Sequence, residues 1–375
     1  MEYRKWYNKD INTSLLGFGA MRLKTVDGEI DEEKALTLID YAYRRGVNYF
    51  DTAMPYTFGK NEKFLGKALK KYTRDSFYLA TKFSFGVINN KEEAQTVIDK
   101  QLANLQTDYI DMYLLHALNK KLIHRIESWN VFAILEKWKS EGKIKNIGFS
   151  FHDDYETFIK ILDMYDWDFC QIQLNYMDTD HQQGIKGYYE LEKRKIPVIV
   201  MEPLKGGKLA SFRHNIEKIL TNHSDVSVAS WAFRWVGSLP GVKVILSGMN
   251  EMNQVIDNVN TFSDFKPISL IEAQKIDSVK KALLSIKAVD CTACRYCMPC
   301  TVGIDIPSYF KIYNTYKMYL DKGDANWQFQ QLKKNSALID ACIKCGKCVN
   351  QCPQDINIPF QLEKMAKEMD FIYKK

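Results

Sequence analysis

Eight short apolar segments, each suited to a buried β-strand, recur through the first two thirds of this chain, at residues 15–21, 47–51, 77–82, 109–116, 145–150, 168–175, 196–202 and 242–247. Amphipathic segments typical of helices lie between them, for example over residues 31–45, 91–105, 129–141 and 153–164. Strands that alternate with helices pair in parallel through right-handed crossovers. Eight such units in about 260 residues therefore predict a closed (β/α)8 TIM barrel in the α/β class.

The cysteines are distributed very unevenly. Eight of the nine lie between Cys291 and Cys352, whereas the first 290 residues contain only Cys170, in a predicted buried strand where it is most simply a small core residue. This shift in composition marks a domain boundary. We predict a barrel domain over residues 1–265, a linker helix over 266–287, and a separate cysteine-rich domain over 288–375.

Composition excludes several classes of protein. Hydrophobic residues make up 46% and charged residues 26%, as in globular chains. The net charge of +6 is spread along the sequence, which argues against a nucleic-acid groove. No apolar run approaches ~18 residues, and the first twenty residues hold no secretory core, so we expect no membrane span, no membrane partner and no secretory signal. Without such a signal, clustered cysteines indicate metal ligands rather than disulfides.

Polar side chains stand where the predicted strands end. Asp51 ends the second strand, Lys82 the third and His116 the fourth, and Tyr56 follows Asp51 by five positions. Barrel enzymes carry their chemistry at this end. A tyrosine of pKa ~10 is a poor acid, but a neighbouring ammonium lowers that value, an aspartate holds the ammonium, and a histidine can orient a carbonyl. The four residue types together predict a proton-donating site.

The motifs around these residues resemble those of the aldo-keto reductases. GFGAMRL, GVNYFDTAMPY, GKNEKFLGKAL, LATK, LLH and IGFS occur in the family's order over roughly residues 1–285. The resemblance implies a barrel that binds NADP or NAD without a Rossmann fold, and the GxGxxG-like pattern at residues 17–22 is indeed incomplete. It further implies Tyr56 as general acid, Lys82 as the partner that lowers its pKa, Asp51 as partner of Lys82, and His116 as the carbonyl-orienting residue.

The same resemblance implies a cofactor site. Ser150 and Gln171 match positions that hold the nicotinamide carboxamide. Met201 stands where many members stack a tyrosine, which leaves room for a flavin as an alternative. Gly248 and Gln254 replace the lysine and arginine that many members use for the 2′-phosphate, so NADH and NADPH both stay open. The implied cofactor-binding residues are Gly19, Met21, Ser150, Gln171, Met201, Pro203, Leu204, Gly206, Gly248, Gln254, Asp257 and Asn258.

The cysteine-rich domain contains two similar ligand runs. Each is C-x2-C-x2-C with a fourth cysteine after it, and the second is C-x2-C-x2-C-x3-C-P, the pattern of bacterial two-cluster ferredoxins. In such proteins the fourth cysteine of each run ligates the other cluster. We therefore predict one [4Fe-4S] cluster on Cys291, Cys294, Cys297 and Cys352, and another on Cys342, Cys345, Cys348 and Cys300. The oxygen sensitivity of exposed iron–sulfur clusters leads us to expect a cytoplasmic protein.

The repeat continues beyond the cysteines. GIDIP at residues 303–307 corresponds to DINIP at 355–359, and each predicts the start of a helix, with a further helical insertion over 309–340. Cys300 follows its run after two residues rather than three, and Thr301 stands where the other copy has Pro353, so a single cluster stays an alternative. Structural zinc is the other alternative, although four-cysteine zinc sites usually use two CxxC pairs.

Together these features predict the ferredoxin-fused branch of the aldo-keto reductases: an NAD(P)H-linked oxidoreductase that reduces a small-molecule carbonyl, or oxidises an alcohol. The clusters would exchange electrons with an external carrier of the ferredoxin or flavodoxin type. A hydride carries two electrons and a cluster one, so a flavin could convert between them. Two other hypotheses remain at this stage: an electron-transfer protein whose barrel is a docking platform, and a redox sensor whose barrel binds pyridine nucleotide.

Overall fold

The computed structural model describes residues 1–7, 9–222 and 226–372. It divides into two compact units. Unit 1 comprises Met1–Gly206 and Ala229–Leu270, and unit 2 comprises Gly207–Val228 and Ile271–Lys375. Each unit has an apolar core of its own.

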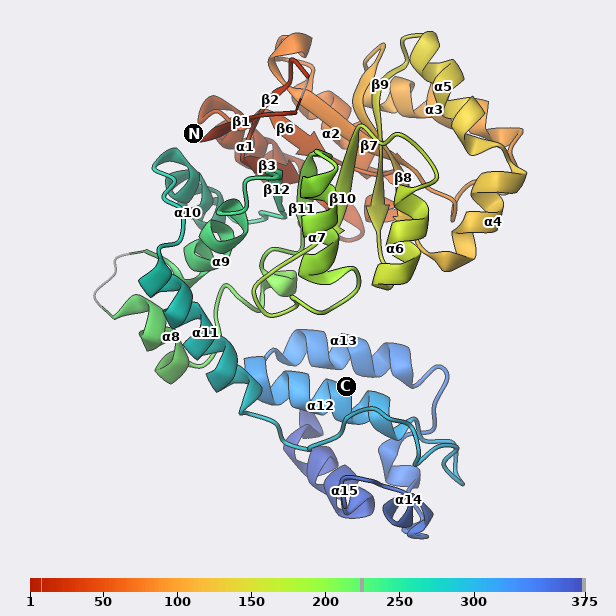
Figure 1. Cartoon of the computed structure of the whole chain (residues 1–375), viewed down its shortest axis with the longest axis vertical. Helices are drawn as coiled ribbons and strands as arrows, with labels where there is room; N and C mark the ends of the chain where they lie inside the picture. The colour runs from red at the N-terminus through yellow and green to blue at the C-terminus, as the bar shows by residue number, and fades with distance from the viewer. Residues whose placement is uncertain (8, 223–225, 373–375) are drawn as a thin grey trace. The chain divides into compact units, whose positions relative to one another are not determined.

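Unit 1 is built on a closed barrel of eight parallel strands, whose arrows lie among the helices of this unit in Figure 1. Each strand pairs with the next along the chain, and the last pairs with the first, so the predicted TIM barrel is confirmed. The strands are β3 (Leu16–Gly19), β6 (Tyr49–Asp51), β7 (Tyr78–Phe83), β8 (Ile110–Leu118), β9 (Ile144–Phe151), β10 (Phe169–Gln173), β11 (Val198–Met201) and β12 (Val242–Ser247).

The helices around the barrel form because each has one apolar stripe to bury. In α1 (Glu32–Arg44) the stripe is Ala35, Leu38, Ile39 and Ala42, and the Asp31 side chain caps the helix by accepting from the Lys34 N–H. The other helices of this unit are α2 (Asn61–Leu69), α3 (Glu93–Leu105), α4 (Lys120–Ser128), α5 (Val131–Ser140), α6 (Tyr155–Leu162), α7 (Gly184–Lys193), α9 (Val228–Gly237, whose first residue is grouped with unit 2) and α10 (Met252–Ser263).

A short hairpin of β1 (Tyr3–Lys5) and β2 (Asn12–Ser14) closes the amino end of the barrel. Trp6 and Ile11, which flank its turn, pack into a cluster with Tyr49, Met112 and Phe169 from the strands. A second, two-stranded hairpin consists of β4 (Thr25–Val26) and β5 (Glu29–Ile30). The amino end is thus filled with apolar side chains, which leaves the carboxyl end of the strands for polar ones.

Unit 2 is helical in the part of the chain that the structure describes. Its core joins Tyr309, Phe310 and Phe329 to Ile358 and Met365. Its helices are α8 (His214–Thr221), α11 (Leu270–Leu284), α12 (Ile306–Tyr319), α13 (Lys322–Leu332), α14 (Lys347–Asn350) and α15 (Ile358–Glu368). The described residues of the two units also form short 3-10 turns: η1 (Ala20–Arg22), η2 (Tyr56–Gly59), η3 (Arg74–Ser76), η4 (Lys205–Gly207), η5 (Ile339–Ala341) and η6 (Asp370–Ile372).

The predicted internal repeat of unit 2 is visible in two helix starts. Pro307 lies in the first turn of α12 and Pro359 in the first turn of α15, where the missing N–H costs nothing. The insertion between the copies is helical, as predicted. Unit 2 also includes the segment 207–228, in which Arg213 Nη2 donates to the Lys317 carbonyl at 2.7 Å and Lys208 pairs with Asp324 at 3.0 Å. The sequence-based boundaries at 265 and 287 do not anticipate this grouping and stay a prediction.

Within residues 1–7, 9–222 and 226–372, no helix combines the length and the apolar character needed to cross a bilayer.

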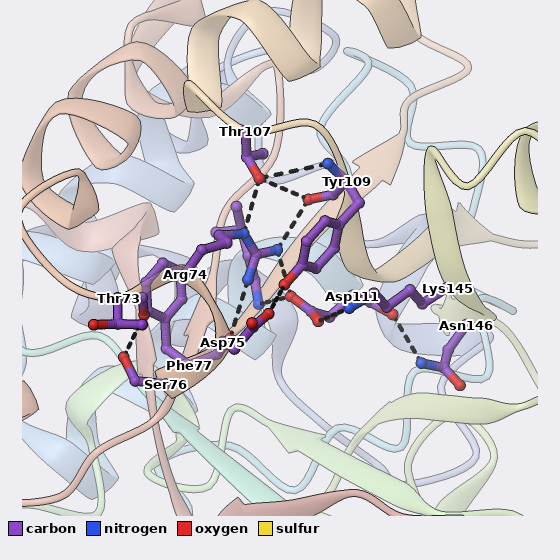
Figure 2. Close-up of polar contacts among 11 residues, drawn as sticks. Thr73, Arg74, Asp75, Ser76, Phe77, Thr107, Tyr109, Asp111, Lys145 and Asn146 are labelled. Carbon is purple, nitrogen blue, oxygen red and sulfur yellow. Dashed lines mark hydrogen bonds and ion pairs between the residues drawn. The ribbon is translucent and has the colours of Figure 1, made fainter.

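A polar network secures the amino ends of β7, β8 and β9, and Figure 2 shows its side chains converging on Arg74 and Asp111. Arg74 Nη2 lies 2.6 Å from Asp111 Oδ2 and 2.9 Å from the Tyr109 carbonyl oxygen, and its Nε donates to Thr107 Oγ1 at 2.8 Å. The same carboxylate oxygen accepts from the Leu79 N–H at 3.0 Å. Asp111 is only 5% exposed, and two cations make its burial tolerable: Arg74, and Lys145, whose Nζ lies 3.7 Å from Asp111 Oδ1.

We expect Arg74→Met to lower the free energy of unfolding by ~2 kcal/mol, because it removes the nearer cation and its hydrogen bonds from a buried carboxylate and leaves only Lys145, at 3.7 Å, to compensate the charge. Urea denaturation followed by circular dichroism measures the change. Arg44→Met is the matched control: Arg44 pairs with Asp40 at 2.8 Å, but its side chain is 74% exposed, so the loss should be under ~1 kcal/mol. Equal effects of the two substitutions would contradict this account of the network.

Candidate active site and cysteine sites

The four predicted catalytic side chains meet at the carboxyl end of the barrel. Lys82 is fully buried, and its Nζ lies 2.7 Å from Asp51 Oδ1 and 2.7 Å from the Thr52 carbonyl oxygen. The same Nζ is 4.9 Å from the centre of the Tyr56 ring, and the Tyr56 and His116 rings are 5.9 Å apart, edge to face. Residues separated by up to 65 positions in the sequence are therefore neighbours in space.

Charge and burial compete at the Tyr56 phenol. Burial raises its pKa above the usual value of 10.0, and this effect is larger than the lowering by the charge and hydrogen bond of Lys82. Burial also acts to lower the pKa of Lys82, but Asp51 and Tyr56 outweigh it, so the ammonium stays charged. Lys82 thus acts in the predicted direction, but in the site without cofactor or substrate the phenol keeps its proton.

His116 is held as a neutral ring. Burial, together with the nearby charges of Lys82 and His152, lowers its pKa from 6.5 to about 3. The Oγ of Ser84, itself only 4% exposed, lies 2.7 Å from His116 Nδ1. When that hydroxyl donates, Nδ1 is the acceptor and Nε2 carries the ring proton, which is the tautomer that can donate to a carbonyl. The sequence analysis did not single out Ser84. Its position two residues after Lys82 could have indicated it, because side chains two residues apart in an extended segment point to the same face.

The segment that carries Tyr56 is held by an amide. Thr57 and Phe58 have φ values of 48° and 53°, in the left-handed region that non-glycine residues seldom occupy. Buried Asn61 donates to the Ala20 carbonyl at 2.9 Å and to Thr57 Oγ1 at 3.1 Å, and it accepts from Thr52 Oγ1 at 2.6 Å. Asn61 therefore joins the ends of two strands to the turn behind Tyr56, a role that the sequence analysis also missed.

The predicted cofactor residues gather at the ends of five neighbouring strands, from β9 round to β3. Ser150 Oγ accepts from the Ala117 N–H at 2.7 Å. Gln171 is 3% exposed; its Nε2 lies 3.5 Å from Met201 Sδ, and its Oε1 has no hydrogen-bond partner in the described part of the chain. A buried carbonyl oxygen without a donor suits the N–H groups of a carboxamide, so these residues fit a nicotinamide ring.

The remaining predicted cofactor residues divide into two groups. Gly19, Met21, Pro203, Leu204 and Gly206 lie in the turns after β3 and β11, and Asn258 Nδ2 donates to Ser247 Oγ at 2.9 Å beyond β12. Gln254 is already engaged in a capping box with Glu251 at the start of α10, near Asp257 in the same helix. A Cβ on Gly248 would lie 2.9 Å from Arg22 Cδ, so the Arg22 side chain occupies the space beside this glycine.

The eight clustered cysteines line two separate hollows within unit 2. Cys291, Cys294, Cys297 and Cys352 line the first, and Cys300, Cys342, Cys345 and Cys348 line the second. Each hollow therefore takes its fourth cysteine from the other run. Among the described residues, no group of three or more His, Cys, Asp and Glu side chains is arranged to hold a metal ion. Four thiols around each hollow are the ligand number that a [4Fe-4S] cluster uses.

Backbone and hydroxyl groups point at some of these sulfurs. The Ala293 N–H donates to Cys291 Sγ at 3.4 Å, and Thr301 Oγ1 lies 3.6 Å from Cys345 Sγ. Hydrogen bonds of this kind are typical around the sulfur ligands of iron–sulfur clusters, where they tune the reduction potential of the cluster. Cys170 is buried in the barrel, as predicted for a core residue.

Comparison with family models decides the relationship. The model described as "Aldo/keto reductase family" matches residues 15–281, which is most of the chain, and a "4Fe-4S dicluster domain" matches residues 290–356. The chain belongs to the aldo/keto reductase family. It is an oxidoreductase of the aldo-keto reductase type that carries a 4Fe-4S domain at its carboxyl-terminal end.

Individual relatives are consistent with this family assignment. L-galactose dehydrogenase of Arabidopsis thaliana is 27% identical over 310 residues, covering 76% of this chain and 96% of that protein. The NADH-specific methylglyoxal reductase of Escherichia coli is 26% identical, covering 67% of this chain and 90% of that protein. Among solved structures, the holo form of aldo-keto reductase AKR11C1 from Bacillus halodurans has a TM-score of 0.62 at 27% identity, covering 74% of this chain and 96% of that one.

A further solved structure shows the fold alone. An aldo-keto reductase from Klebsiella pneumoniae in complex with NADPH has a TM-score of 0.61 at 22% identity, covering 75% of this chain and 96% of that one.

The pKa of His116 predicts its behaviour in solution. With a pKa of about 3 in the folded protein, the ring should show no protonation between pH 5 and 9. Histidine ring signals followed by NMR across that range, with His116→Gln to assign the resonance, test this. A His116 signal that titrates near 6.5 would contradict the description of the site.

Proposed function

We propose that the barrel catalyses the reduction of a small-molecule carbonyl to an alcohol with NADH or NADPH, or the reverse reaction. The observation that carries this proposal is the meeting of Tyr56, Lys82, Asp51 and His116 at one end of the barrel. Bound NAD(P)H supplies a hydride to the carbonyl carbon, and the Tyr56 hydroxyl gives its proton to the carbonyl oxygen. Lys82 stabilises the resulting phenolate, and Asp51 keeps Lys82 charged.

His116 has a separate part in this proposal. A neutral imidazole with its proton on Nε2 donates a hydrogen bond to the carbonyl oxygen and leaves the proton transfer to Tyr56. Ser84 keeps that tautomer by donating to Nδ1 at 2.7 Å. The low pKa supports this assignment, because an imidazolium would compete with Tyr56 as the proton donor.

The proposed cofactor site lies along the ends of β9 to β12 and β3. Gln171, with its unpartnered Oε1, and Ser150 would hold the nicotinamide carboxamide, and Met201 would lie against the ring. Asn258 and Asp257 would lie at the adenosine end, with Gly248 and Gln254 in place of two cations. Gln254 serves as a helix cap, so it does not distinguish NADH from NADPH, and both cofactors stay open.

We further propose that unit 2 holds two [4Fe-4S] clusters, each completed by the fourth cysteine of the other run, as the two hollows suggest. The clusters would carry single electrons to or from an external carrier of the ferredoxin or flavodoxin type. A flavin near Met201 would reconcile two-electron with one-electron chemistry. Exposed clusters are damaged by oxygen, which supports a reducing, cytoplasmic setting.

Tyr56→Phe tests the reductase. Removal of the only proposed proton donor should lower kcat for carbonyl reduction by roughly 10²- to 10⁴-fold. Binding of NADH or NADPH, measured by cofactor fluorescence, should stay within about threefold, since the ring remains. Tyr189→Phe, at an exposed position, is the matched control. Turnover by Tyr56→Phe at the rate of that control would remove Tyr56 from its role and favour a barrel that binds nucleotide without catalysis.

The cluster proposal predicts metal content and its dependence on single thiols. Anaerobically purified protein should hold about eight iron and eight sulfide per chain, and Cys352→Ala should lose about half of both, from the cluster of the first run. Cys170→Ala should keep all of it, because Cys170 lies in the barrel core. Iron and sulfide analysis with electron paramagnetic resonance measures this. Stoichiometric zinc, or four irons in the wild type, would overturn the two-cluster assignment.

A further inference from the structure

A pocket of about 380 Å³ opens directly beside His116. Its walls are largely apolar, with Phe85, Val87 and Leu122 among them, and Asn119 lies at the start of α4. Because His116 and Pro55, the neighbour of Tyr56 in the chain, line this pocket, we take it as the space for the carbonyl substrate of the proposed reaction. The chemistry of its lining residues therefore indicates which class of substrate the site accepts.

Arg125 is the one lining residue of this pocket that carries a full charge, since His116 is neutral. Its Nη1 donates to the Phe85 carbonyl at 3.1 Å and its Nη2 to the Ile88 carbonyl at 2.8 Å. The guanidinium also lies 4.2 Å from the centre of the Trp129 ring. These contacts fix the direction of the guanidinium but neutralise none of its charge.

Several donors of Arg125 are left over. A guanidinium has five N–H groups, and the two carbonyls take two of them. In the part of the chain that the structure describes, no acidic side chain forms an ion pair with Arg125, and its Nε forms no hydrogen bond. A fixed cation with free donors in an apolar pocket is suited to a carboxylate, which Arg binds through two parallel hydrogen bonds.

We propose that this reductase acts on aldehydes or ketones that carry one carboxylate, and that Arg125 binds that carboxylate while His116 faces the carbonyl. The proposal rests on the proposed carbonyl reduction and names its substrate class. A single charge matches a carboxylate, whereas a phosphate dianion would leave one negative charge without a partner in an apolar pocket. Lys120 and Lys121 on the same helix add further positive charge to it.

The spacing between the two recognition groups is set by one segment of chain. Residues 84–88 hold His116 through the Ser84 hydroxyl and Arg125 through the carbonyls of Phe85 and Ile88. Because the same five residues fix both groups, the distance between the bound carbonyl and the bound carboxylate is constrained. The enzyme should therefore prefer one chain length among carboxylated aldehydes.

The test compares matched substrate pairs on the full-length holoenzyme: succinic semialdehyde with butanal, and 4-carboxybenzaldehyde with benzaldehyde. The better carboxylated member should have a kcat/KM at least tenfold above its uncharged partner. Arg125→Met should remove roughly 10- to 100-fold of kcat/KM for that substrate, mainly through KM, and change the uncharged partner by less than about threefold. Arg125→Lys should restore part of the loss.

Lys121→Met is the control variant, because it removes an equal charge from the same helix outside the pocket lining. It should leave the preference for the carboxylated substrate within about twofold. If Lys121→Met and Arg125→Met reduce the preference for the carboxylated substrate equally, the positive electrostatic potential of the helix is responsible rather than a carboxylate site, and the proposal fails. It also fails if the wild type prefers the uncharged partners, or if Arg125→Met affects both members alike.

A binding measurement separates this proposal from the reductase proposal. Calorimetric titration of the cofactor-loaded protein with benzoate, against benzamide, needs no turnover. Benzoate binding that is lost in Arg125→Met would support the carboxylate site even if no carbonyl were reduced. Equal binding of benzoate by the wild type and by Arg125→Met would overturn the carboxylate site even if carbonyl reduction were found.

Discussion

The ion pair between Lys82 and Asp51 is the interaction on which the polar end of this barrel depends. An ammonium buried among strands is tolerated only because a carboxylate and the Thr52 carbonyl lie 2.7 Å from it. Loss of either charge would leave the other uncompensated, at a cost of ~3–5 kcal/mol. The pair comes from adjacent strands, so it is set by barrel register, and it places a positive charge under the Tyr56 ring and beside His116.

The barrel separates stability from chemistry along its axis. At the amino end, the network around Arg74 and Asp111 connects neighbouring strands, and the β1–β2 hairpin packs Trp6 against them. At the carboxyl end, buried groups are left without partners, such as Asp51 Oδ2 and Gln171 Oε1, and the backbone after Tyr56 adopts left-handed φ values. Unsatisfied groups and local strain cost stability and persist where a site requires them.

Much of this arrangement could be predicted from sequence, because strand periodicity fixes the fold and parallel strands bring their carboxyl ends together. Asp51, Lys82 and His116 therefore meet as expected. Other features depend on three-dimensional packing that no local pattern records. The net pKa of Tyr56 depends on how deeply it is buried, and the Ser84 contact depends on the rotation of the His116 ring. The segment 207–228 carries the same helical pattern as any barrel helix, so its membership of unit 2 could not be read from its residues.

The exchange of fourth cysteines between the two runs has a consequence for biosynthesis. The first hollow includes Cys352 as well as Cys291, and the second includes Cys300 as well as Cys348. During translation the first run would therefore wait, with three thiols and no fourth, until the second run has been made. Both sets of ligands become complete within four residues of each other, so the proposed clusters would be loaded together rather than one after the other. A polypeptide truncated between the runs would expose reactive thiols and retain no complete site.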